Sequence, residues 1–199
     1  MSEPGAGSAV TELQTSAKKT DKGYVLNGSK VFSTHSPEAH VFLVYVRFGP
    51  GLDGIGSVLV DRGTPGLTVG QPSSFMSGEQ WSQLYFENCE ISEADVLLGP
   101  GGFKKQISGF NIERIGNSSR ALALGRYAFN QAKEYASVRE QFGKKIRDFQ
   151  GIQWKFAEMA VKLDAAQLLL YKAAVNADSG LPSAYETTVA KYICNTTGF

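Results

Sequence analysis

Cysteine and histidine are scarce in this sequence, with two residues of each among its 199. Cys89 and Cys194 lie far apart and outside any C-x-x-C spacing, which excludes a disulfide framework and a thiolate metal site. His35 and His40 stand in a strand-rich region, where we expect surface or hydrogen-bonded histidines rather than metal ligands. The sequence therefore predicts no bound metal and two reduced cysteines.

Long apolar runs and an excess of one charge are also absent. No stretch reaches the roughly eighteen apolar residues that a membrane-spanning helix needs, and no charged-then-apolar leader opens the chain. The 20 basic and 19 acidic side chains leave a net charge of +1, which gives no argument for a nucleic acid, an anionic membrane or an acidic partner. We expect a soluble, intracellular protein.

The character of the sequence changes near residue 100. Before it, short apolar or alternating runs are separated by turn residues such as Asn27-Gly28, which is typical of an antiparallel β-domain of barrel or sandwich type. The runs are YVLNGSKVFST, HVFLVYVRF, GSVLVD, LTVG and SQLYFENCEI. The sequence therefore predicts a β-domain over residues 1–100.

From residue 104 onward the apolar residues recur at helical spacing. We expect a first long helix with Glu113 near its start, and Gly143 is expected to break the helical run. Its predicted buried face contains Ile115, Leu122, Leu124, Ala128, Ala132 and Tyr135. A second helix is expected over 148–177, with its buried face formed by Ile152, Phe156, Met159, Leu163, Ala166, Leu169 and Leu170.

The turn Ser179-Gly180-Leu181-Pro182 separates the second helix from a third that reaches Phe199. Long amphipathic helices with short connections normally belong to bundles, so residues 104–199 predict antiparallel helices of an incomplete four-helix bundle. The fold class is therefore α+β. Both ends of the chain look abrupt, and we expect further segments before Met1 and after Phe199.

Three stretches carry candidate chemistry, each with a structural alternative. The loop from Ser2 to Ser8 is either a ligand-binding loop, since glycine permits close approach, or a simple turn. It is not a dinucleotide fingerprint, because Gly5-x-Gly7 lacks the third glycine and no helix opens after it. Glu113 and Arg114 are either a general base with a substrate contact or part of a solvated polar stripe.

The third stretch is basic and surrounds Phe142-Gly143. Its cationic side chains are Arg139, Lys144, Lys145 and Arg147. They either stabilise a helix C-terminus or form an anion site, in which Arg139 could fork onto a pyrophosphate. The residues alone leave both interpretations open.

In their order along the chain, these motifs resemble the acyl-CoA dehydrogenase family of flavoproteins. SEPGAGS is similar to the family's T-E-P-x-A-G-S loop, NGSKVFST to N-G-x-K-x-W-I-T, and REQFGKKIRDFQ to R-x-x-F-G-x-x-I-x-x-x-Q. LYFENCEISEADVLLGPGGF resembles the passage that leads into the C-terminal helices. The resemblance implies a middle β-domain over 1–100 and the first part of a C-terminal helical domain over 104–199.

The resemblance also implies a role for particular residues in binding FAD. It places Ser2, Glu3, Gly7 and Ser8 in the loop that lines the flavin ring. It places Phe32, Ser33 and Thr34 against the isoalloxazine, with Phe32 where the family usually has tryptophan, so that an N–H donor is lost. Arg139, Phe142 and Gln150 match positions that hold FAD phosphates and adenosine, largely across a subunit boundary.

The reaction that the resemblance implies is α,β-desaturation of an acyl-CoA thioester. Glu113 matches the α-proton base of the family members that carry it in an E-R pair, while Arg114, Asn111 and Ser8 match substrate contacts. The expected partners are the acyl-CoA substrate, an electron-transferring flavoprotein and further copies of the chain, as a tetramer or dimer. In most family members the base is instead a glutamate nearer the C-terminus, which would lie beyond Phe199. Two alternative functions remain: a non-catalytic fragment or interaction module, and an acyl-CoA oxidase.

Overall fold

The computed structural model describes residues 1–177 and 180–199, and these fall into two compact units, Met1–Gln106 and Ile107–Phe199. Within the predicted turn before the third helix, Ser179 lies outside the described residues.

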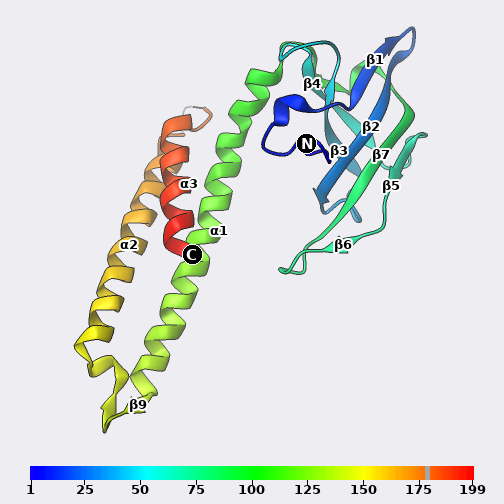
Figure 1. Ribbon diagram of the computed structural model, residues 1–199. Helices are drawn as coiled ribbons and strands as arrows, with labels where there is room; N and C mark the ends of the chain where they lie inside the picture. Colours follow the sequence, from blue (N-terminus) through cyan, green and yellow to red (C-terminus); the bar gives the residue numbers. More distant parts are fainter. Residues whose placement is uncertain (178–179) are drawn as a thin grey trace. The chain divides into compact units, whose positions relative to one another are not determined.

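The first unit is built on an eight-stranded sheet with the strand order β5-β7-β2-β1-β3-β4-β8, in which β6 pairs with β7 (Figure 1). Its strands are β1 Ser16–Thr20, β2 Gly23–Thr34, β3 Val41–Arg47, β4 Ile55–Asp61, β5 Leu67–Val69, β6 Ser73–Ser74, β7 Gln80–Ile91 and β8 Val96–Leu98. Short 3-10 helices occupy Val10–Glu12 and Glu93–Asp95. The five predicted strand runs are all confirmed.

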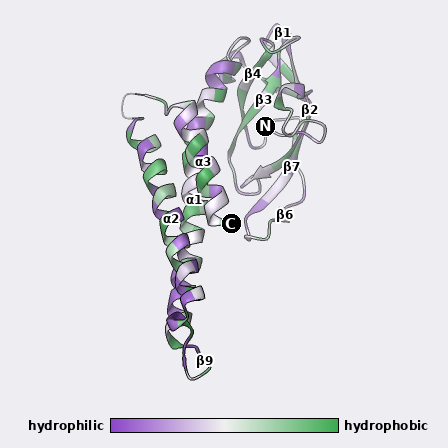
Figure 2. Cartoon of the chain, turned by 60° about the vertical axis from the view of Figure 1, so that its left-hand side comes forward, coloured by the Kyte–Doolittle hydropathy of each residue, from purple (hydrophilic) through white to green (hydrophobic). Residues whose placement is uncertain are grey.

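The sheet is open rather than a closed barrel, because the described pairings leave β5 and β8 at opposite ends of the strand order. Its pairing is antiparallel except where β1 meets β3, which is parallel at Ser16 and Arg47. The core lies on the face where alternate residues of β2, β3, β4 and β7 meet, and β3 and β4 carry the hydrophobic colour in Figure 2. The alternating runs therefore predicted the strands, whereas they did not decide whether the sheet closes.

Asn27 and Gly28 lie inside β2 and do not form the predicted turn. A register shift against β7 falls between Leu26 and Gly28, and Gly28 has a φ of +144°. A Cβ at Gly28 would approach the Thr15 Cα to 2.6 Å. Glycine is therefore required at position 28 by a β-bulge and by the close approach of another backbone segment. Hairpin turns also favour glycine, so the sequence alone did not separate the two.

The second unit contains the helices α2 Gln150–Val175 and α3 Ala184–Gly198 and most of α1 Phe103–Val138. The predicted second and third helices are confirmed within a few residues. The helix α1 begins at Phe103, next to the predicted residue 104, so Glu113 is not near its start, and it ends at Val138 rather than at Gly143. Between α1 and α2 the chain forms a two-stranded hairpin, β9 Glu140–Gln141 with β10 Lys144–Lys145, followed by a 3-10 helix at Ile146–Asp148.

The buried face of α1 differs from the predicted one. Leu124 and Tyr135 are 63% and 58% exposed, whereas Leu122 and Ala136 are buried and Ile115 and Phe129 are partly buried. The core of this unit consists of Leu122, Leu163, Ala166, Leu170, Ala173, Ala190 and Cys194. Residues 115, 122, 129 and 136 repeat every seventh position, the spacing of helices that pack along their length. None of the helices in the described ranges is long and apolar enough to cross a membrane.

Candidate functional site

The N-terminal loop is a tight turn closed by two reciprocal hydrogen bonds. The Glu3 N–H donates to the Ala6 carbonyl at 3.0 Å, and the Ala6 N–H donates to the Glu3 carbonyl at 3.1 Å. Pro4 and Gly5 occupy the centre of the turn, where proline restricts φ and glycine adds no side chain. The loop therefore has a defined shape rather than a random path.

A buried ion pair anchors this loop to the sheet. The Lys30 Nζ lies 2.7 Å from the Glu3 Oε1, and the two side chains are only 2% and 7% exposed. The Glu3 carboxylate also accepts hydrogen bonds from the Thr15 N–H and hydroxyl, at 2.9 and 2.6 Å, and from the Gln14 N–H at 2.6 Å. Lys30 belongs to β2, and Gln14 and Thr15 belong to the segment just before β1, so the carboxylate fastens the loop to both.

The electrostatics of the pair follow from this geometry. Burial raises the pKa of the Glu3 carboxyl, but the hydrogen bonds from Lys30, Thr15 and Gln14 outweigh it and hold the pKa below 4.5. Burial lowers the pKa of Lys30, and the attraction of Glu3 offsets only part of that effect. The ionised carboxylate is therefore the form that the folded loop stabilises.

The same loop lies directly beside the predicted aromatic segment of β2. The Val31 N–H donates to the Ser2 carbonyl at 2.9 Å, and Phe32, Ser33 and Thr34 follow. Phe32 has a φ of +55° at a register shift between Lys30 and Ser33, and its ring is 57% exposed. The structure thus brings two stretches that are far apart in sequence to one place.

This place fits a flat, polar-edged ligand. An added Cβ at Gly5 or Gly7 would meet nothing within 4 Å, so packing within the described chain does not explain these glycines. The N–H groups of Gly7 and Ser8 donate to no described residue, which leaves two donors on the exposed side of the loop. An exposed ring and free N–H donors are what a planar cofactor such as a flavin needs, so the residues fit the FAD implied by the resemblance.

Sequence reasoning missed two residues at this site. Lys30 is fully buried although lysine is seldom buried, and its inward position in the alternation of β2 was a usable signal. Trp81 faces Thr34 across the β2–β7 pair, and its ring centroid lies 4.8 Å from that of Phe32. No local pattern connects residues 32 and 81, because their contact depends on strand register.

In the helical unit, Glu113 and its neighbours lie on the third turn of α1. The Arg114 Nη1 donates to the Asn111 Oδ1 at 2.6 Å, and the Asn111 Nδ2 donates to the Pro182 carbonyl at 2.8 Å. Asn111 is buried, so its amide orients Arg114 and joins α1 to the chain before α3. The Glu113 side chain is exposed, and its carboxylate makes no hydrogen bond or ion pair with a described residue.

The basic stretch forms the hairpin between α1 and α2 instead of capping a helix. Phe142 and Gly143 both have positive φ, +51° and +76°, as a two-residue turn requires, and the Phe142 ring is 92% exposed. Lys145 pairs with Glu140 at 2.6 Å and Arg147 with Asp148 at 3.8 Å. The Arg139 guanidinium has no such partner in the described chain and remains available to an anion.

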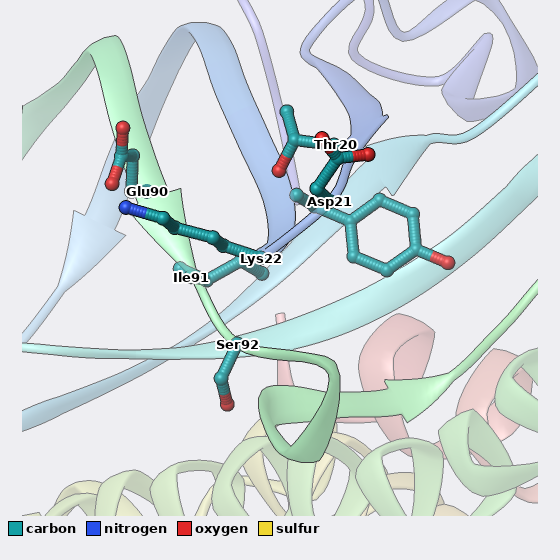
Figure 3. Close-up of a pocket in the computed structure, with 7 residues that line it drawn as sticks. Thr20, Asp21, Lys22, Glu90, Ile91 and Ser92 are labelled. Carbon is teal, nitrogen blue, oxygen red and sulfur yellow. The ribbon is translucent and has the colours of Figure 1, made fainter.

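A groove at the β1–β2 turn is separate from all these residues (Figure 3). Its walls are Thr20, Asp21, Lys22, Tyr24, Glu90, Ile91 and Ser92, and the Lys22 side chain extends toward Glu90. No residue predicted for the site lies in it. Across the described residues no cluster of histidine, cysteine and carboxylate groups could hold a metal ion, and Cys89 and Cys194 are free and buried.

Comparison with known proteins assigns both parts of the chain. The family model for the acyl-CoA dehydrogenase middle domain matches residues 1–89, and that for the acyl-CoA dehydrogenase C-terminal domain matches residues 100–199. The short/branched chain specific acyl-CoA dehydrogenase of Rattus norvegicus mitochondria is 40% identical over 197 residues, which cover 96% of this chain and 46% of the rat protein.

Solved structures agree with this assignment. Butyryl-CoA dehydrogenase from Megasphaera elsdenii superimposes with a TM-score of 0.93 at 34% identity, covering 98% of this chain and 53% of that one. A chain in a solved structure whose subject is the electron transferring flavoprotein of Acidaminococcus fermentans superimposes with a TM-score of 0.92 at 33% identity. The match covers 98% of this chain and 53% of that chain. The chain spans about half the length of the curated relatives that it matches. It belongs to the acyl-CoA dehydrogenase family, whose members are flavoproteins.

Proposed function

We propose that the chain carries out the FAD-dependent α,β-desaturation of an acyl-CoA thioester, with residues 1–100 as the middle β-domain and 104–199 as the C-terminal helical domain. The order of the two family matches and the names of the relatives support this proposal. When bound, FAD supplies the acceptor for the hydride that leaves the β-carbon of the substrate.

In this proposal the β unit holds the flavin ring. Ser2, the Glu3 backbone, Gly7 and Ser8 line one side of the site through the loop, and the free N–H groups of Gly7 and Ser8 donate to its polar edge. Phe32 presents its ring face, while Ser33 and Thr34 provide polar contacts beside it. The buried Glu3–Lys30 pair keeps these two segments at a fixed separation.

The family motifs assign further contacts to the helical unit, of which those to FAD lie largely across a subunit boundary in the family. Arg139 binds phosphate through its fork of donors, with Phe142 and Gln150 against the adenosine. Arg114, oriented by Asn111, and the hydroxyl of Ser8 contact the thioester or the acyl chain. Each of these roles is a prediction carried over from the family motifs.

The observation that carries the chemistry is the unpaired carboxylate of Glu113. A carboxylate that is not held in an ion pair can accept a proton from the α-carbon, and the neighbouring Arg114 is already bonded to Asn111. Glu113 therefore removes the α-proton in the proposed reaction, and the hydride leaves from the adjacent carbon.

The test is Glu113→Gln in the purified chain supplied with FAD, with butyryl-CoA and a branched acyl-CoA as substrates and a ferricenium-type dye as acceptor. We expect turnover to fall by about a thousandfold or more, while the flavin absorbance of the purified protein stays unchanged. Glu134→Gln, an exposed glutamate of the same helix, is the matched control and should keep full turnover. Undiminished turnover in Glu113→Gln would assign the base to another residue.

We also propose an electron-transferring flavoprotein as the partner and a tetramer or dimer as the assembly. The assembly is supported by an exposed apolar stripe on α2, formed by Trp154, Val161, Leu168 and Val175. Each of these side chains is about two-thirds exposed, and each lies seven residues from the next. An exposed apolar row of this regularity favours packing against the helix of another copy. The expected location is a prokaryotic cytoplasm or a mitochondrial matrix.

Simple measurements distinguish the proposed dehydrogenase from the two alternative functions. An acyl-CoA oxidase would turn over with oxygen alone, whereas a dehydrogenase needs the dye or the flavoprotein partner. A non-catalytic fragment or interaction module would purify without stoichiometric flavin. The flavin absorbance and the oxygen consumption of the parent chain distinguish all three.

A further inference from the structure

A row of aromatic rings runs along one end of the sheet, in which Phe32 and Phe75 are 57% and 37% exposed and Trp81 is partly buried. The ring centroids of Phe32 and Trp81 are 4.8 Å apart with a tilt of 55°, and those of Trp81 and Phe75 are 6.1 Å apart with a tilt of 30°. Trp81 pairs with Thr34 across β2 and β7, and paired residues project from the same face of a sheet. Phe32, Thr34 and Trp81 therefore share one surface.

The backbone keeps this surface exposed at an energetic cost. Phe32 lies in the left-handed region with a φ of +55°, which an L side chain other than asparagine or aspartate seldom adopts. Its ring nevertheless remains more than half in solvent, so burial within the described chain does not offset that strain. Strain that persists at an exposed aromatic residue points to a binding role for the surface.

Trp81 also supplies a group that Phe32 lacks. Its indole Nε1–H is a donor, and it has no hydrogen-bond partner among the described residues. The indole combines a broad stacking face with a donor at its edge, next to the hydroxyl of Thr34. The stacking face and the donor are complementary to a flat heterocycle that carries acceptor atoms on its rim.

We propose that Trp81 is a further flavin-contact residue, whose indole continues the ring surface begun by Phe32 and donates its N–H to the cofactor edge. This inference rests on the proposed function, because the ligand is the flavin of that same site. It adds a residue of β7 to the contacts of the flavin ring, which the sequence motifs assign to the N-terminal loop and β2.

The chain offers a direct test because it has only two tryptophans, Trp81 and Trp154. Trp154→Phe leaves Trp81 as the only indole, and Trp154 belongs to α2 in the other unit. Titrating FAD into this full-length variant should quench most of the indole emission at one flavin per chain. The reciprocal variant, Trp81→Phe, reports Trp154 and should lose much less emission.

Affinity provides the second measurement. Trp81→Leu should bind FAD roughly three- to tenfold more weakly than the parent chain, whereas Trp81→Phe, which keeps a ring and loses the donor, should weaken binding less. Tyr85→Leu, which replaces a partly exposed aromatic residue of the same strand, is the matched control and should bind FAD as the parent does. The quenching experiment keeps Trp81 intact, so it decides the matter even where Trp81→Leu folds poorly.

Three outcomes would overturn the inference. If FAD binds stoichiometrically and the Trp81 emission is unchanged, Trp81 does not contact flavin although the proposed function stands. If the emission responds to protein concentration and not to FAD, the aromatic row is a protein-docking surface. If the parent chain retains no flavin at all, the proposed function fails and the inference fails with it.

Discussion

At the scale of single residues, the Glu3–Lys30 pair explains how an exposed loop keeps a defined shape. Two charges removed from water are costly unless each is fully satisfied, and the Glu3 carboxylate has four donors around it. Removing either partner leaves the other charge buried and unpaired. The pair therefore couples loop geometry to the stability of the sheet.

Lys30→Met should lower the free energy of unfolding by about 3–5 kcal/mol, because it leaves the Glu3 carboxylate buried without its cation. Denaturant titration of the full chain, followed by circular dichroism, measures the change. Lys18→Met is the matched control, since Lys18 is exposed on the neighbouring strand β1 and should cost less than about 0.5 kcal/mol. Equal effects of the two substitutions would show that the pair does not fasten the loop.

Acid should destabilise the loop through Glu3. Unfolded Glu3 takes up its proton near pH 4.5, whereas folded Glu3 takes it up only at lower pH because its pKa is lowered. Its contribution to stability is therefore complete above pH 4.5 and is lost as the pH falls through the folded pKa. Thermal midpoints should fall more steeply below pH 4.5 in the parent than in the double variant Glu3→Gln/Lys30→Met. Parallel curves would refute this assignment.

At the scale of elements, the helical unit depends on which stripe of α1 is buried. Gly125 lies on that side, and a Cβ built there would approach the Gly198 Cα of α3 to 3.0 Å and the Leu163 Cδ2 of α2 to 3.1 Å. Gly116, on the same helix, would meet nothing within 4 Å. Close packing against α2 and α3 therefore explains glycine at position 125 but not at position 116.

Gly125→Leu should destabilise the helical unit by about 1–3 kcal/mol, because the larger side chain overpacks the contact with α2 and α3. Gly116→Leu should instead be neutral or stabilise it by up to about 1 kcal/mol, since leucine has the higher helix propensity. Differential scanning calorimetry of both variants beside the parent gives the signs. A stabilising Gly125→Leu would contradict the packing described for α1.

Much of the element structure was readable from local sequence. Alternation predicted β2, β3, β4, β5 and β7, and helical spacing predicted α2 and α3, because each signal lies within one segment. The buried stripe of α1 was not readable, since leucine and tyrosine occur on more than one of its faces. Asn27-Gly28 was misread because glycine serves bulges and turns alike.

At the scale of the whole molecule, we propose that the exposed stripe on α2 packs against other copies of the chain. Leu168→Lys places a charge at the middle of the stripe formed by Trp154, Val161, Leu168 and Val175, so it should shift the assembly toward monomers. Sedimentation velocity or light scattering measures the mass. Tyr185→Lys, at an exposed position of α3, is the control and should leave the mass unchanged. An unchanged mass in Leu168→Lys would exclude this stripe as an interface.

The sequence by itself determined the change from strands to helices near residue 100, the membership of the family and the motifs that carry the candidate chemistry. These follow from local periodicity and from residue order, which need no tertiary contact. Only the tertiary structure decided that Lys30 is buried against Glu3, that Trp81 lies beside Phe32, and that Asn111 orients Arg114. Those contacts depend on strand register and on which helical stripe turns inward, and both are set by packing between segments that are distant in the chain.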